Sequence, residues 1–327
     1  MRKTIFSMLC LLFSIWGASA QRATYFDLAQ ENPCSTCPNY TANLAQLPHY
    51  RPDQIQTAFK LLTTSGIQFN FPQGGCQNRA EMMSLLLART AHIQHCRVWL
   101  FPPANLTPDA TTKLELPDKN RLAPGNTIEW FYHVAPCVLV DRPSGVDTLV
   151  LDPALNARQP LKLDAWLSLI TNAEVSKYTF LASDWYFFLT NANRLSGEFY
   201  KFELDPRYCG GDSYRNLTME RSLAINDMAI YIFQKYLVPL RTSPRSSDAA
   251  SYAELQKLFG NVSALEAFFS NGQGYCGKTP DNNVSIRHFY AAYPTLLADA
   301  QTYYIQRVGY WAQRSTVLLD ATIPAPH

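Results

Sequence analysis

The stretch Pro72-Gln73-Gly74-Gly75-Cys76-Gln77-Asn78-Arg79-Ala80 marks a turn that passes directly into a helix. Proline and glycine break regular structure here, because proline lacks a backbone N–H and glycine adopts turn conformations that other residues avoid. From Cys76 onward, Ala80, Met83 and Leu87 recur at the spacing of one helical face. We therefore predict that Cys76 lies at the N-terminus of a helix whose apolar face packs on a core.

Helical and extended patterns surround this segment. Apolar residues at helical spacing predict a helix over residues 52–64, and a short extended run follows at 67–71. The proline-bearing residues 102–126 are typical of a long surface loop. Runs rich in β-branched and aromatic residues predict three strands, at residues 97–101, 128–140 and 147–151. A helix packed on such strands is an α+β arrangement.

A hairpin of the last two strands is expected to bring two polar side chains together. His133 lies in the strand 128–140, and Asp152 directly follows the strand 147–151. Antiparallel pairing of these strands returns Asp152 toward His133.

The first residues have the pattern of a secretory signal peptide. Arg2 and Lys3 precede an apolar run over residues 5–16, and Ala18-Ser19-Ala20 fits cleavage before Gln21. The run is short for a membrane span, and a retained N-terminal anchor is the alternative. We therefore expect a secreted or periplasmic protein.

The second half of the chain is dominated by helical patterns. A helix at residues 163–170 and a strand at 178–181 precede longer helical stretches at 217–240, 252–270 and 288–313. We predict four parts: a signal peptide (1–20), an N-terminal segment that is open to a pro-segment role (21–50), an α+β catalytic domain (51–205) and a mainly helical C-terminal region (206–327).

Composition and charge exclude several classes of protein. Of the 327 residues, 47% are hydrophobic and 17% are charged, which fits a globular chain and not a disordered one. Loss of Arg2 and Lys3 from 28 basic residues leaves 26, against 26 acidic residues. Because a net charge near zero provides no basic patch, we expect neither nucleic acid nor a membrane as partner. The oligomeric state stays open.

Cysteine usage predicts disulfide bonds and one free thiol. Eight cysteines become seven when Cys10 leaves with the signal peptide, and exported cysteines are usually paired. We predict that Cys76 stays free and that the pairs are Cys34 with Cys37, Cys96 with Cys137, and Cys209 with Cys276. Half of a zinc site at Cys34-x-x-Cys37 is the alternative. No second Cys or His pair in the sequence completes it, so we expect no metal.

Cys76, His133 and Asp152 are the residue types that a thiol nucleophile needs. A thiol attacks as the thiolate, which a helix N-terminus, a nearby imidazole and a carboxylate that orients the imidazole all favour. Each residue alone also fits a structural role. Cys76 could be half of a disulfide, His133 a buried strand histidine, and Asp152 a turn residue before Pro153. Their order along the chain and the odd cysteine count favour a nucleophilic Cys-His-Asp site.

Three segments resemble the protein glutaminase (protein-glutamine deamidase) family. That family carries a Gly-Cys-x-x-Arg-Ala helix start, a Trp-x-Tyr-His-Val-Ala strand and an Ile-Asp-Pro-Ser strand end. The matching segments are Gly74-Gly75-Cys76-Gln77-Asn78-Arg79-Ala80, Trp130-Phe131-Tyr132-His133-Val134-Ala135-Pro136 and Leu149-Val150-Leu151-Asp152-Pro153-Ala154-Leu155, within about residues 50–160.

This resemblance implies a papain- or transglutaminase-like fold and a defined chemistry. Cys76 would be the nucleophile, His133 the general base and acid, and Asp152 the orienting carboxylate. The reaction would hydrolyse glutamine side-chain amides in proteins or peptides and release ammonia, without a metal or organic cofactor. The family resemblance and the signal peptide also suggest a bacterial protein.

Two positions depart from the family pattern. Gln77-Asn78 follows the cysteine where the family tends to have an aromatic residue or histidine and then alanine, and Glu81 stands where histidine is common. These neighbours bear on substrate preference or on the level of activity. They leave Cys76, His133 and Asp152 in place.

Four further residues are candidates for substrate binding. The Cys76 backbone N–H would stabilise the oxyanion, with Asn70 or Gln73 as second donor, although both also fit ordinary turn positions. Gly75 lets the backbone approach the substrate closely. Trp130 is a candidate wall of the acyl-binding slot. Strand alternation, however, places Trp130 opposite to His133, where a core role fits equally.

Cys, His and Asp side chains in this arrangement also catalyse other reactions. A transglutaminase passes the thioester to a lysine amine, and a cysteine protease cuts a backbone amide. A non-enzymatic, disulfide-bonded secreted binding protein is the alternative from another class. The residues of the three motifs favour a deamidase. Its partners would be proteins or peptides with an accessible glutamine.

Overall fold

A six-stranded sheet forms the centre of the molecule. The computed structural model describes residues 42–107, 109–183, 185–189, 197–201, 214–269 and 283–320. The antiparallel strand order is β7-β6-β5-β2-β8, and β1 pairs in parallel with the far end of β5. The strands are β1 (His49–Tyr50), β2 (Cys96–Phe101), β5 (His133–Arg142), β6 (Gly145–Val150), β7 (Leu161–Lys162) and β8 (Lys177–Ala182).

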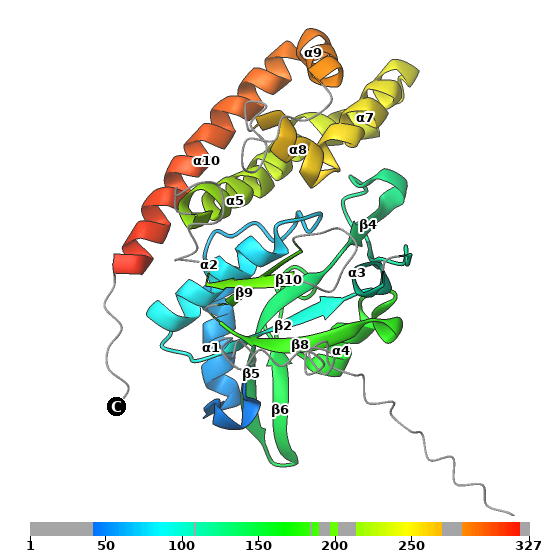
Figure 1. Ribbon diagram of the computed structural model, residues 1–327. Helices are drawn as coiled ribbons and strands as arrows, with labels where there is room; N and C mark the ends of the chain where they lie inside the picture. The colour runs from blue at the N-terminus through cyan, green and yellow to red at the C-terminus, as the bar shows by residue number, and fades with distance from the viewer. Residues whose placement is uncertain are drawn as a thin grey trace, which may run out of the picture.

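Alternation along the strands gives the sheet two buried faces. In β2, Trp99 and Phe101 join the larger apolar core, whereas Val98 and Leu100 join a second cluster on the opposite face. Helices α1 (Pro52–Thr63) and α2 (Cys76–Arg89) belong to the larger core, and α4 (Leu163–Ser168) belongs to the second cluster (Figure 1). Helix α2 packs on β5, which places the N-terminus of α2 near the start of that strand.

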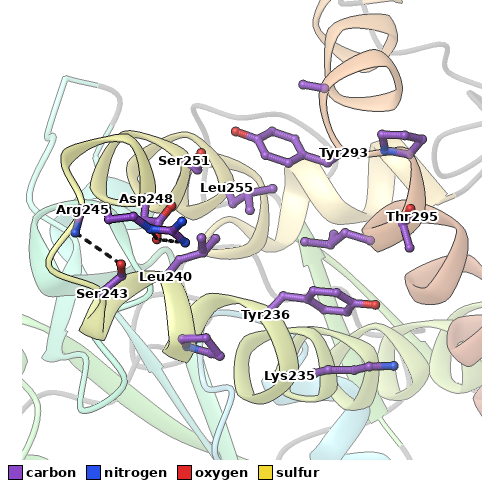
Figure 2. Close-up of a pocket in the computed structure, with 14 residues that line it drawn as sticks. Lys235, Tyr236, Leu240, Ser243, Arg245, Asp248, Ser251, Leu255, Tyr293 and Thr295 are labelled. Atoms are coloured by element: carbon purple, nitrogen blue, oxygen red, sulfur yellow. Dashed lines mark hydrogen bonds and ion pairs between the residues drawn. The ribbon is translucent and has the colours of Figure 1, made fainter.

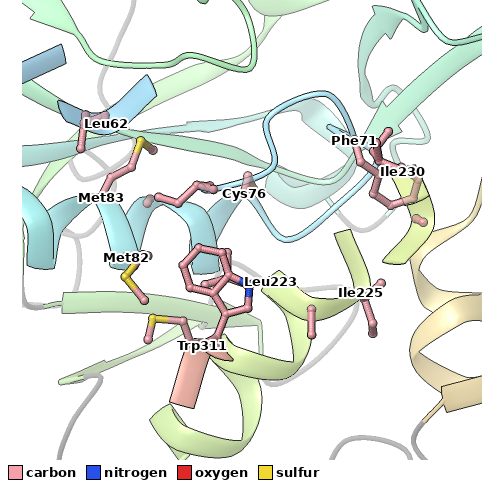
Figure 3. Packing of buried hydrophobic residues seen from close by; sticks show 14 of the residues in the cluster. Leu62, Phe71, Cys76, Met82, Met83, Leu223, Ile225, Ile230 and Trp311 are labelled. Atoms are coloured by element: carbon pink, nitrogen blue, oxygen red, sulfur yellow. The ribbon is translucent and has the colours of Figure 1, made fainter. Parts of the chain in front are cut away.

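The C-terminal helices pack on the other side of α2. Helix α10 lies along α5, and both contact α2 (Figure 1). Leu223 of α5 and Trp311 of α10 share a cluster with Cys76, Met82 and Met83 (Figure 3). The helices are α5 (Tyr214–Ile232), the π-helical turn η7 (Phe233–Leu237), α6 (Val238–Thr242), α7 (Ser246–Phe259), α8 (Val262–Phe269), α9 (Asn283–Ala292) and α10 (Pro294–Asp320).

The structure confirms the predicted α+β class, with the cysteine-bearing helix on an antiparallel sheet and a helical C-terminal region. Helix α1 buries its apolar residues Ile55, Ala58, Phe59 and Leu62, which recur at helical spacing. The β5–β6 hairpin is also confirmed. The predicted boundary between residues 205 and 206 lies outside the described residues and stays a prediction.

Two predictions of local structure are wrong. The extended run at residues 67–71 is not one of them, and it pairs with no strand among the described residues. Residues 102–126 are not a plain loop. They contain α3 (Pro103–Leu106), β3 (Leu114–Pro117) and η4 (Pro124–Asn126).

The predicted strand 128–140 is two strands in two different sheets. β4 (Thr127–Trp130) pairs with β3, whereas β5 pairs with β2 and β6. The chain must therefore turn between Trp130 and His133 to pass from one sheet to the other. A further two-stranded sheet joins β9 (Trp185–Leu189) to β10 (Gly197–Lys201).

Cys96 and Cys137 are the predicted disulfide pair that falls within the described residues. They face each other in the register of β2 and β5, and their sulfur atoms lie 3.0 Å apart. Both are free thiols in this structure, so this disulfide stays a prediction. The other two predicted pairs and the predicted signal peptide lie outside the described residues. None of the described helices is both long and apolar enough to cross a membrane.

Glu81 has a structural partner that accounts for its place in α2. Its carboxylate forms a buried ion pair with Arg97 of β2, and the Arg97 Nε also donates a hydrogen bond to Ser84. Loss of one partner from a buried pair is costly, because the other charge stays in the core.

We expect Glu81→Ala to lower the free energy of unfolding by about 3–5 kcal/mol. The change leaves the buried guanidinium of Arg97 without its carboxylate. Urea denaturation of the purified variant measures the loss. Glu81→Met combined with Arg97→Met removes both charges, so we expect this double variant to lose much less. An equal loss in both variants would contradict the importance of the pair.

Candidate active site

His133 and Asp152 form a buried pair. His133 Nε2 and Asp152 Oδ2 are 2.8 Å apart, and the two side chains are 1% and 4% exposed. His133 begins β5 and Asp152 lies just after β6, so the β5–β6 hairpin brings them together. The second carboxylate oxygen, Oδ1, accepts a hydrogen bond from the backbone N–H of Ala154 at 3.1 Å.

The surroundings of His133 favour its protonated form. Burial alone lowers the pKa of the imidazole, but the charge and hydrogen bond of Asp152, together with the nearby Cys76, outweigh burial and raise the pKa to about 9. Burial raises the pKa of Asp152, whereas the His133 charge, the hydrogen bonds with His133 and Trp166, and the charge of Arg79 lower it overall. The pair is therefore an imidazolium and a carboxylate at neutral pH.

Two tryptophan rings stack on the imidazole of His133. Trp130 stacks on one ring face at 4.3 Å between centroids with 6° between planes, and Trp166 stacks at 5.5 Å with 18°. The expectation that Trp130 lies opposite to His133 is wrong, because alternation does not continue through the turn between β4 and β5. Trp130 is 4% exposed, and its Nε1 donates to the Pro72 carbonyl at 2.7 Å.

Cys76 reaches this pair from the N-terminus of α2. It is the first residue of the helix, is 5% exposed, and follows Gly75, whose φ of 70° is left-handed. Its Sγ lies 3.9 Å from the carbonyl oxygen of Tyr132, the residue before His133. His133 Nδ1 is buried and has no hydrogen-bond partner among the described residues. Because Asp152 occupies Nε2, Nδ1 is the nitrogen left to exchange a proton with the thiol.

Arg79 holds the turn that precedes Cys76. This side chain is 2% exposed, and its Nη1 donates to the carbonyls of Phe71 at 3.2 Å and Gly74 at 2.7 Å. Burial lowers the pKa of Arg79, and the charges of Cys76 and Asp152 act in the opposite direction. The guanidinium therefore fixes the glycine turn and also places a cation near the two acidic groups.

Of the other predicted site residues, Gln73 is buried and Asn70 is exposed. Gln73 Nε2 donates to Asp118 at 3.0 Å. Asp118 in turn accepts backbone hydrogen bonds from Leu122 and Ala123. The Asn70 carbonyl accepts a hydrogen bond from Asn120, and no hydrogen bond among the described residues joins its side chain to Cys76, His133 or Asp152. The roles of Asn70, Gln73, Gly75 and Trp130 in substrate binding stay predictions.

The part of the chain that carries this geometry matches a known family model. A family model described as Glutaminase matches residues 51–170, which include Cys76, His133 and Asp152. This part of the chain is therefore similar to the glutaminase family. No curated protein matches the chain.

Solved structures similar to this chain carry the name protein-glutaminase. The NMR structure of the enzyme from Chryseobacterium proteolyticum is 18% identical, with a TM-score of 0.38 over 56% of this chain and 89% of that one. A crystal structure of protein-glutaminase is 17% identical, with a TM-score of 0.34 over 55% and 84% of the two chains. One of pro-protein-glutaminase is 19% identical, with a TM-score of 0.34 over 45% and 53%.

The C-terminal helices contact the glycine turn before Cys76 directly. A Cβ on Gly74 would lie 2.3 Å from Cγ1 of Val262 in α8. A Cβ on Gly75 would lie 2.6 Å from Oγ of Ser222 and 3.2 Å from Nδ2 of Asn226, both in α5. Glycine is therefore required at both positions for α5 and α8 to pack against the turn before Cys76.

We expect Gly75→Ala to lower the free energy of unfolding by about 1–3 kcal/mol, from left-handed backbone strain and overpacking. Urea denaturation measures the change. Ser222→Ala removes the nearest atom, so the same Gly75→Ala change should cost less in that background. An identical cost in both backgrounds would contradict the packing of α5 on the turn.

Other features of the chain lie away from this site. A cavity of about 530 Å³ lies among η7, α6, α7 and the start of α10, and none of the predicted site residues lines it (Figure 2). Among the residues that the structure describes, no group of three or more His, Cys, Asp or Glu side chains is placed to hold a metal ion.

Sequence reasoning missed two residues at this site. Trp166 contacts both His133 and Asp152, and Asp118 holds Gln73. A tryptophan inside the predicted helix 163–170 was the one available signal, because a buried indole N–H usually has a partner. Which partner it has depends on contacts that are distant in the sequence.

Proposed function

We propose that this protein hydrolyses the side-chain amide of glutamine residues in proteins or peptides to glutamate and ammonia, with Cys76 as nucleophile. The observation that supports this most directly is the Cys76 thiol at the N-terminus of α2, next to the buried His133–Asp152 pair. The match of residues 51–170 to a family model described as Glutaminase supports an amide substrate.

The proposed reaction begins from an ion pair in which the proton of the Cys76 thiol is already on His133. The thiolate attacks the carboxamide carbon and forms the carbon–sulfur bond, and the oxyanion is stabilised by the Cys76 backbone N–H, because N–H groups in the first turn of a helix have no partner within it. Protonated His133 then gives its proton to the nitrogen, so the carbon–nitrogen bond breaks and ammonia leaves.

Hydrolysis of the thioester completes the proposed cycle. Neutral His133 takes a proton from water, and the hydroxide attacks the acyl carbon. The carbon–sulfur bond breaks, glutamate is released, and the proton returns to the Cys76–His133 pair. Asp152 keeps the imidazole oriented in both half-reactions.

We also propose that the protein is exported. The pattern of residues 1–20 supports cleavage before Gln21. In an oxidising compartment the adjacent thiols of Cys96 and Cys137, at 3.0 Å, would be placed to form a disulfide bond.

Product analysis tests the proposed reaction. The mature protein is incubated with a glutamine-containing protein, a blocked glutamine dipeptide and its asparagine counterpart, with a lysine peptide as competing amine. We expect ammonia and glutamate from the glutamine substrates. Protein alkylated at Cys76 is the matched control. Cross-linked products would instead indicate a transglutaminase, backbone fragments a protease, and the absence of every product a binding protein.

A further inference from the structure

Trp166 makes two contacts with the His133–Asp152 pair. Its Nε1 donates a hydrogen bond to Asp152 Oδ2 at 2.9 Å, which is the same oxygen that His133 Nε2 contacts at 2.8 Å. Its ring also stacks on the imidazole of His133 at 5.5 Å. The side chain is fully buried, at 0% exposure, so it is shielded from a substrate.

We propose that Trp166 is a positioning residue for the active site, acting through the Asp152 carboxylate on the Cys76–His133 pair. This inference rests on the proposed function. Trp166 lies outside the three motifs that suggest the family and comes from α4 on the opposite face of the sheet from α2.

The hydrogen bond from Trp166 helps to orient the Asp152 carboxylate. The backbone N–H of Ala154 holds Oδ1 at 3.1 Å, and Trp166 holds Oδ2. With both oxygens held, the carboxylate plane is fixed and His133 meets its acceptor at one angle. Trp130 and Trp166 both stack on the imidazole, which restricts rotation of the ring.

The two tryptophans differ in one respect that an experiment can use. Both stack on His133, but the indole N–H of Trp130 donates to the Pro72 carbonyl, whereas that of Trp166 donates to the carboxylate. Phenylalanine keeps an aromatic ring and removes the N–H. Trp130→Phe is therefore the matched control for Trp166→Phe.

Loss of the Trp166 hydrogen bond should make Asp152 easier to protonate. The charged groups that act on Asp152 are His133 from β5 and Arg79 from α2, and both favour the ionised carboxylate. Cys76 acts on the pair through His133. Removal of the Trp166 donor raises the pKa of Asp152. The carboxylate is then protonated at a higher pH, and the ion pair with the His133 imidazolium is lost at that pH.

The test is the pH dependence of Cys76 alkylation by iodoacetamide, followed by mass spectrometry of the peptide that contains Cys76. We expect Trp166→Phe to move the acid limb of the alkylation profile to higher pH by about one unit, the size of one hydrogen bond to a charged group. Trp130→Phe keeps every donor to Asp152, so it should move this limb much less. If the protein deamidates glutamine, Trp166→Phe should also lower kcat about tenfold with little change in KM.

Alkylation reports on the thiol without any substrate, so failure of the proposed function leaves this test intact. An alkylation profile of folded Trp166→Phe that matches wild type would overturn the positioning role. If the variant does not fold, the Trp166 indole resonance of ¹⁵N-tryptophan-labelled wild-type protein gives the answer. It should shift with pH at the midpoint of the acid limb, and an indole resonance that is constant through that midpoint would overturn the proposal.

Discussion

Cys76→Ala is expected to remove ammonia release from glutamine substrates below detection, a loss of roughly a million-fold in kcat. The thiol is the group that forms the proposed acyl-enzyme, and no other described side chain that contacts His133 can replace it as nucleophile. The measurement is ammonia release together with glutamate formation from the blocked glutamine dipeptide. The fold should persist, because the substitution removes one sulfur atom at the first position of α2.

Cys96→Ala is the control for this loss. Cys96 is as buried as Cys76, at 1% against 5% exposure, but lies in the second apolar cluster on the other face of the sheet. We expect this variant to keep deamidation within a few-fold of wild type, whatever its effect on the melting temperature. Activity that survives in Cys76→Ala would show that the thiol is not the nucleophile.

Local periodicity was sufficient to predict the elements that carry the candidate site. Residues 52–64 and the segment that begins at Cys76 have one apolar face each, and both form helices with those faces buried. The β5–β6 hairpin follows from two adjacent extended runs, and it brings His133 to Asp152. These inferences depend on neighbours in the sequence, where the pattern carries the information.

The features that were not predicted from the sequence depend on contacts between distant segments. β3 is a strand because it pairs with β4, and this pairing is also what splits the predicted strand 128–140. The partner of the Trp166 indole lies 14 residues away, and the partners of Gly74 and Gly75 lie in α5 and α8. Hydrophobic periodicity cannot predict such pairings. It indicates which face of a segment is apolar, but it does not identify the segment that packs on that face.

Asp152→Ala is expected to lower kcat/KM roughly 10⁴-fold, the scale seen when the carboxylate of such a triad is removed. The substitution leaves His133 Nε2 and Trp166 Nε1 buried without their shared acceptor. It also removes the charge that holds the imidazole protonated, so burial then lowers the pKa of His133. Steady-state kinetics with the glutamine dipeptide across pH measure both effects.

Asp152→Asn separates the charge of the carboxylate from its hydrogen bonds. The asparagine oxygen can still accept from His133 and Trp166, so we expect this variant to lose less than Asp152→Ala. In the wild type the pKa of His133 is raised to about 9, so the imidazolium persists below that pH and activity should decline as the pH passes it. In Asp152→Asn the raising charge is absent and burial remains, so the alkaline limb should move to lower pH. An alkaline limb that stays in place would show that Asp152 orients His133 without setting its protonation.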